Sequence, residues 1–121
     1  MSGTWFPESA VRVRAGRMSD RGNPDGTVLD WSPAAVDRAP LSGLNVQPRV
    51  QAEDVEADRA PVVTGWRVQG DEGVDLDVTA RDRIEWRGEL FEVEGEVARW
   101  PDPTTAGGLH HVEFSIVRVT G

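Results

Sequence analysis

The sequence predicts an all-β fold, a small six-stranded β-barrel with a long early loop, and three observations lead to this prediction. About six segments alternate apolar and polar residues with a period of two, which is typical of half-buried strands. Residues that favour turns, mainly Gly, Pro, Asp and Ser, separate these segments. No segment carries a sustained helical pattern, and 121 residues suffice for a single domain with a modest core.

The N-terminal part predicts one strand followed by the long loop. Residues 9–17 (SAVRVRAGR) alternate valine with arginine, which indicates a strand with one buried and one solvated face. Residues 18–43 are rich in Gly, Pro, Asp and Ser and show no sustained periodicity, so we expect a loop of about 25 residues. Loops of this length are usually functional or disordered, and Trp31 in its middle argues against disorder.

Two further strands flank an acidic segment. Residues 44–51 alternate again, and Pro48, which cannot donate a backbone hydrogen bond, predicts an edge strand or a bulge. Residues 52–61 are acidic and too few for a stable isolated helix, so we predict a mobile loop that contains at most one helical turn. Residues 62–70 predict the next strand, and residues 71–80 predict a short extended segment across one end of a sheet.

Residues 82–96 (DRIEWRGELFEVEGE) predict a β-hairpin, because Gly88-Glu89 suits a two-residue type II′ turn. Ile84, Trp86, Phe91 and Val93 then share one face, which we predict to be the core face. The implied cross-strand pairs are Arg87 with Leu90, Trp86 with Phe91, Glu85 with Glu92, Ile84 with Val93, and Arg83 with Glu94. The pair of Glu85 and Glu92 is mildly destabilising. These carboxylates form either a solvated outer face or a contact with an arginine-rich neighbouring surface.

The C-terminal part predicts a loop over 97–108 and a long strand over 109–120. Within this strand the apolar residues change face between Ile116 and Val117, which indicates a bulge or a strand buried on both sides. Six strands with turns between them fit a barrel of the size of SH3 and OB domains, in which closure removes exposed edges.

The charge of the chain is negative and unevenly distributed. Residues 1–50 contain six Arg and five acidic residues (+1), whereas residues 51–121 contain seven Arg and sixteen acidic residues (−9), which together give −8. This sign does not favour binding to phosphate backbones. The chain has no Cys, which excludes disulfides and thiolate metal sites, and no apolar run approaches the roughly 20 residues of a membrane span. We therefore expect a soluble protein without a membrane partner.

The search for catalytic or metal-binding motifs predicts neither an enzyme nor a cofactor. His110 and His111 are adjacent, and adjacent strand residues point to opposite faces, so they do not readily share one metal ion. Asp75 and Asp77 lie on one strand face, as a hydrolytic pair of carboxylates would, but solvated acidic residues are far more common. No glycine-rich phosphate loop, nucleophile elbow, zinc motif or calcium loop occurs. A small hydrolase is the weakest of the functional hypotheses.

The candidate functional residues are therefore interface residues. Trp31 and Trp100 lie beside prolines in predicted loops, where an interface anchor is as reasonable as packing. Asp30, next to Trp31, and the Glu85 and Glu92 pair complete the candidate set. The alternative is a ligand-binding barrel with an aromatic platform for oligosaccharides or single-stranded nucleic acid, although nucleic-acid platforms combine aromatic with basic residues.

The order of four motifs resembles the head-to-tail stopper, or head closure, proteins of tailed bacteriophages, especially those of actinobacterial hosts. The motifs are DRGNPDGTVLDWS, LNVQPRVQAED, DRIEWRGELFEVEGEVARWPDP and the terminal HVEFSIVRV, and the likeness extends over nearly the whole chain from residue 9. The resemblance implies a virion protein, assembled in the host cytoplasm, that forms a homo-oligomeric ring in the phage neck. Its partners would be the adaptor on the portal and the tail terminator.

In that family a long loop projects toward the DNA channel and closes it after genome packaging. The best match here is 18–43, with 52–61 as the competing segment. Two physical observations agree with the resemblance. Acidic walls would let DNA pass without binding, and the difference in charge between the two halves suits a subunit that contacts its neighbours through different surfaces.

Overall fold

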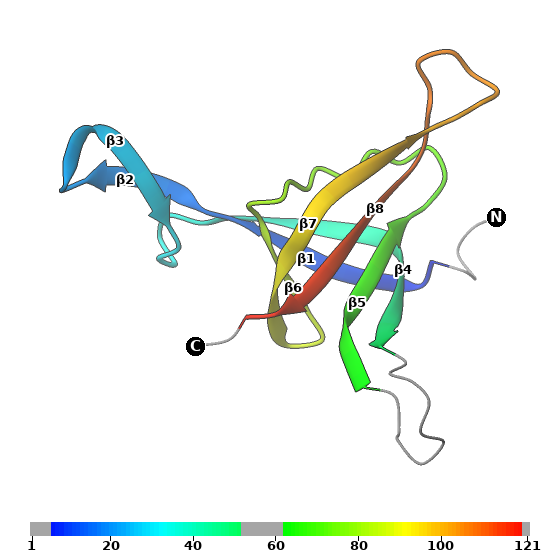
Figure 1. Ribbon diagram of the computed structural model, residues 1–121, viewed down its shortest axis with the longest axis horizontal. Helices are drawn as coiled ribbons and strands as arrows, with labels where there is room; N and C mark the ends of the chain where they lie inside the picture. The colour runs from blue at the N-terminus through cyan, green and yellow to red at the C-terminus, as the bar shows by residue number, and fades with distance from the viewer. Residues whose placement is uncertain (1–5, 52–61, 120–121) are drawn as a thin grey trace.

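The computed structural model of the chain describes residues 6–51 and 62–119, and it contains strands without helices in these ranges (Figure 1). The strands are β1 (Glu8–Arg14), β2 (Gly16–Asp20), β3 (Asn23–Asp30), β4 (Asp37–Gln51), β5 (Val62–Gly70), β6 (Arg83–Trp86), β7 (Glu89–Pro101) and β8 (Leu109–Arg118). The predicted all-β fold is therefore confirmed.

Six of these strands close into an antiparallel barrel in the order β1-β4-β5-β8-β7-β6, with β6 pairing back onto β1. Strands β2 and β3 form a separate two-stranded sheet, which projects away from the barrel as an arm (Figure 1). We use "arm" for residues Gly16–Asp30 throughout. The barrel confirms the six-stranded prediction.

The barrel interior is filled by apolar side chains from all six strands and from the connection between β5 and β6. Trp86 lies at the centre of an aromatic group, with its ring centroid 4.8 Å from that of Trp66 and 5.9 Å from that of Phe91. The buried cluster consists of Ala10, Leu41, Leu44, Val68, Leu76, Val78, Ile84, Trp86, Phe91, Val93, Val112, Phe114 and Ile116. A ligand site would therefore have to lie on the outside of the barrel.

The connection between β5 and β6 covers one end of the barrel, in line with the predicted extended segment. Leu76 and Val78 are 5% and 0% exposed and belong to the core. A Cβ atom at Gly70 would lie 2.8 Å from Leu76 Cδ1, so the glycine lets this segment approach the end of β5 closely.

The predicted loop over 18–43 is wrong, because this range contains most of the arm and the first part of β4. A two-residue turn at Arg21-Gly22 joins β2 to β3, and Asp20 Oδ1 accepts a hydrogen bond of 2.9 Å from the Gly22 backbone N–H. A two-stranded ribbon that packs on no core has no requirement for one apolar face, so its sequence shows no alternation. The competing loop, 52–61, lies outside the described residues.

Pro48 lies in a part of β4 that has a partner strand on one side only, as the predicted edge strand requires. Strand β4 pairs with β1 only as far as Leu44 and with β5 from Leu44 onward, so Pro48 has a partner strand on one side, at Trp66. A residue without a backbone N–H is tolerated at such a position, because the open side needs no donor.

The β6–β7 hairpin confirms the predicted core face but not the predicted register. The turn is formed by Arg87-Gly88, with φ angles of 51° and 75°, as a type I′ turn requires. The observed pairs are Arg83 with Glu92, Ile84 with Phe91, Glu85 with Leu90, and Trp86 with Glu89. The shift equals two residues, so each side chain keeps its face. The predicted opposition of Glu85 and Glu92 is wrong.

The predicted bulge lies in the neighbouring strand. The register between β7 and β8 shifts between Glu94 and Ala98, where Gly95 has a φ of 77°, while Val112, Phe114 and Ile116 of β8 stay on the core side. The predicted loop over 97–108 is shorter than expected, because β7 continues to Pro101.

Candidate functional site

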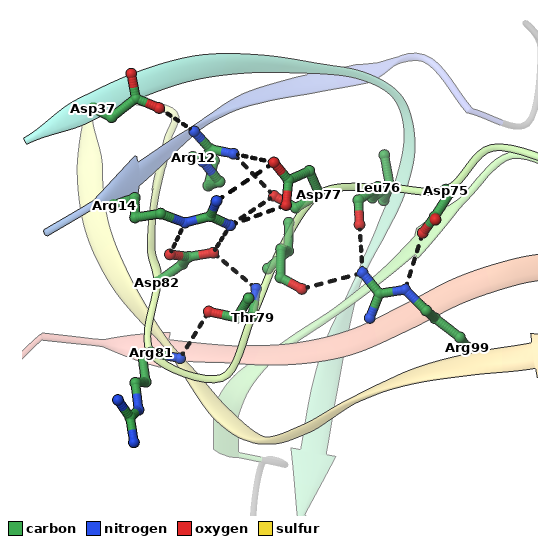
Figure 2. A network of polar contacts seen from close by, with 11 residues as sticks. Arg12, Arg14, Asp37, Asp75, Leu76, Asp77, Thr79, Arg81, Asp82 and Arg99 are labelled. Atoms are coloured by element: carbon green, nitrogen blue, oxygen red, sulfur yellow. Dashed lines mark hydrogen bonds and ion pairs between the residues drawn. The ribbon is translucent and has the colours of Figure 1, made fainter.

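A network of arginines and aspartates fixes the base of the arm (Figure 2). Arg12 and Arg14 come from the end of β1, Asp37 begins β4, and Asp77 and Asp82 belong to the connection before β6. We call these five residues the root network. Since β1 leads into the arm and β4 follows it, the network holds both ends of the arm against the barrel.

Arg12 is the buried centre of this network, with 4% of the residue exposed. Its Nη1 donates a hydrogen bond of 2.7 Å to Asp77 Oδ2, and its Nη2 forms an ion pair with Asp37. The expectation that β1 alternates buried valines with solvated arginines is therefore wrong at this position. A buried guanidinium needs partners on both sides, and the two aspartates supply them.

Arg14 makes a bidentate contact with Asp82, which is only 2% exposed. Arg14 Nε and Nη2 lie 2.9 Å from Asp82 Oδ1 and Oδ2, and the Thr79 backbone N–H donates to Asp82 Oδ2 at 2.7 Å. Hydrogen bonds with Asp82 and then Asp77 raise the pKa of Arg14. The guanidinium therefore stays charged at every physiological pH.

Replacing Asp82 by alanine should lower the free energy of unfolding by about 2–3 kcal/mol, because the Thr79 N–H loses its acceptor and Arg14 loses its bidentate partner. Arg14 remains partly exposed and keeps Asp77, which limits the loss. Urea denaturation at pH 7 measures this difference.

Asp75→Ala is the matched control for this substitution. Asp75 lies in the same connection as Asp82 and forms an ion pair of 2.9 Å with Arg99 of β7. Both side chains are exposed, so a loss below about 1 kcal/mol is expected. Equal losses for the two variants would show that the root network does not stabilise the fold.

The acid limb of stability should depend on Asp77. The hydrogen bond from Arg14 lowers the pKa of this carboxyl, and the charge of Arg14 acts in the same direction. A lowered folded-state pKa contributes stability above the unfolded-state pKa of about 3.9, and this contribution disappears as the pH falls through the folded-state value. Between pH 5 and pH 3, Asp77→Asn should therefore lose less stability than the wild type. Parallel pH profiles from urea denaturation would contradict this.

The arm carries apolar side chains that no other part of the described chain covers. Met18 and Val28 are direct cross-strand partners and are 50% and 42% exposed. Leu29 points to the opposite face and lines a hollow with Thr79 and Arg81 beside the root network. An isolated two-stranded ribbon is marginally stable in water, so the Met18–Val28 face is a candidate contact surface.

A groove lies on the barrel next to the base of the arm. It has a volume of about 260 Å³ and is lined by Val13, Trp31, Pro33, Val36, Arg38, Arg83, Glu85 and Leu90. We call it the root groove. The Arg83 guanidinium lies over the Trp31 ring, with its Cζ 4.0 Å from the ring centroid, which is a favourable cation–π arrangement.

Two of the predicted interface residues meet in this groove, and a third lies beside it. Trp31 and Glu85 both line the groove, and Asp30 precedes Trp31 at the end of β3. Asp30 accepts a hydrogen bond of 3.0 Å from the Ser32 backbone N–H, which lowers its pKa, so it caps the turn that follows the arm. Glu85 forms an ion pair of 2.8 Å with Arg38, so its arginine partner comes from the same chain.

The other two predicted interface residues lie elsewhere. Trp100 is 49% exposed near the far end of β7, where its ring stacks on His111 and its Nε1 donates to Glu113 at 3.1 Å. Glu92 is exposed on the outer face of β7, opposite Arg83 of β6. The five candidates therefore do not form one site.

The histidine pair is arranged differently from the prediction. His110 Nδ1 and His111 Nδ1 are 2.8 Å apart and share a hydrogen bond, and the two rings meet edge-on with their centroids 5.1 Å apart. No group of three or more His, Cys, Asp or Glu residues in the described ranges is placed to hold a metal ion. Asp75 pairs with Arg99 and Asp77 with Arg12 and Arg14, so each aspartate of the postulated hydrolytic pair has an arginine partner.

Comparison with known proteins adds no family assignment: the chain matches no protein-family model and no curated protein. Within the part of the chain that the structure describes, no helix has the length and apolar character needed to cross a membrane.

Proposed function

We propose that this chain is a structural protein of the tailed-phage neck, a head-to-tail stopper that forms a ring between the portal–adaptor complex and the tail and closes the DNA channel after packaging. The observation that carries the proposal is the arm, which leaves a closed barrel (Figure 1). Its Met18 and Val28 are exposed. Together with the resemblance of the motifs, it favours an assembly function over a ligand-binding barrel.

The arm gives the proposed ring a projecting element in the range where the resemblance expects one. It is a β-hairpin, whose direction is held by the root network through the ion pairs of Arg12 and Arg14. A paired hairpin has fewer backbone conformations to lose on contact than an unstructured loop, so it costs less conformational entropy on assembly.

The charge of the barrel suits a channel that carries DNA. Glu92, Glu94 and Glu96 are all exposed along β7, and the chain has a net charge of −8. A ring with such residues on its inner wall repels phosphates, so DNA passes through without sequence-specific binding.

Co-sedimentation with the portal and adaptor proteins of the same virus tests the proposal. We expect the chain to be monomeric or weakly associating alone and to sediment with the portal–adaptor complex, where electron microscopy should show an added ring. A chain that never sediments with this complex, even at high concentration, would overturn the proposed function.

A further inference from the structure

Two apolar surfaces of this chain are open at the same time. One is the exposed Met18–Val28 face of the projecting arm, and the other is the root groove, in which Leu90 is 37% exposed. A protruding apolar face and an apolar hollow are the two halves of a heterologous contact, in which one subunit inserts into the next.

The net charges of the two surfaces are weakly complementary. In the root groove Glu85 pairs with Arg38, and Arg83 stacks on Trp31. The residues that line the groove therefore have a net charge of +1, while its floor is apolar. The arm contains two arginines and three aspartates, a net charge of −1. This composition favours an apolar, weakly acidic occupant over a strongly charged one.

The arm cannot fill the groove of its own chain. Trp31 follows β3 directly, so the groove lies at the base of the arm, while the arm extends away from the barrel (Figure 1). The root network ties both ends of the arm to the barrel, which prevents it from folding back. An arm that fills this groove must therefore belong to another molecule.

We infer that the Met18–Val28 face of the arm docks in the root groove of a second copy of this chain. The inference rests on the proposed function, since a contact of this kind repeated around an axis closes a ring. Methionine suits the protruding position because its unbranched side chain adapts to an irregular hollow. Leu90 and Trp31 would form the floor that it contacts.

Disulfide cross-linking tests the contact, because the natural chain has no cysteine that would interfere. The full chain with Met18→Cys and Leu90→Cys is oxidised, both alone at high concentration and bound to the portal–adaptor complex. Both positions are exposed, so folding should be unaffected. We expect a ladder of dimers, trimers and larger species on non-reducing gels, which disappears on reduction.

The matched control combines Met18→Cys with Trp100→Cys, since Trp100 is also exposed on β7 but lies outside the root groove. It should give only a background level of dimer. A ladder no stronger than this control, under both conditions, would overturn the inference. If the chain sediments with the complex but gives no such ladder, the docking is overturned and the proposed neck function is not. A ladder from a chain that never joins the complex supports the docking and overturns the neck function.

Discussion

Trp86→Ala should lower the free energy of unfolding by about 3–5 kcal/mol, the largest loss of stability that we expect from a single substitution in this chain. The side chain is buried, with 4% of the residue exposed, and it packs edge-on against Trp66 and against Phe91. Its Nε1 donates a hydrogen bond of 3.2 Å to Glu8, which ties β6 to the start of β1. Alanine would leave a cavity where two edges of the barrel close.

Urea denaturation followed by circular dichroism measures this loss. The free energy of unfolding of natural domains is about 5–15 kcal/mol. A loss of the expected size should therefore populate unfolded Trp86→Ala chains at low urea concentrations. Trp100→Ala is the control: that residue is 49% exposed, and its truncation removes mainly a surface contact with His111 and Glu113. We expect a loss of about 1 kcal/mol or less for the control. Similar losses in both variants would contradict the packing observed around Trp86.

The β6–β7 hairpin shows which features of the fold can be predicted from sequence. Its core face follows from the alternation of apolar and polar residues. Side-chain direction in a strand repeats every two residues, so a register that differs by two residues buries the same side chains. The register depends on the turn, and here Arg87 adopts a positive φ that non-glycine residues rarely take. The preference for glycine in the first turn position predicts a turn at Gly88-Glu89, one residue later than the observed Arg87-Gly88 turn.

The arm and the root network could not be predicted for a different reason. Arg12 can be buried because Asp37 and Asp77 pair with its guanidinium. These partners lie 25 and 65 residues away in the chain, and alternation carries no information on such distant contacts. The arm follows the turn chemistry of Asp20 and Gly22, but no core imposes a pattern on its strands. The candidate site combines these two features with the root groove. Sequence identified Trp31 and Glu85 in the groove and Asp30 beside it, but it missed Met18 and Val28.

The second large effect concerns assembly. The double substitution Met18→Asp with Val28→Lys should abolish co-sedimentation with the portal–adaptor complex. It replaces the only exposed cross-strand pair of large apolar residues within the described part of the arm by two charged groups. Charged groups that lose their hydration against an apolar surface cost far more than the burial of Met and Val contributes. The introduced opposite charges face each other across the two strands, which keeps the arm paired in the monomer.

Two comparisons separate a lost contact from a lost fold. The urea midpoint of the double variant should match that of the wild type, because exposed substitutions usually change stability by about 0.5 kcal/mol or less. Val74→Asp places a charge at a similarly exposed apolar residue, 42% exposed, in the connection between β5 and β6, and it should leave co-sedimentation unchanged. If the double variant sediments with the complex as the wild type does, the apolar face of the arm takes no part in assembly. If Val74→Asp also prevents sedimentation, the contact surface extends over the barrel end.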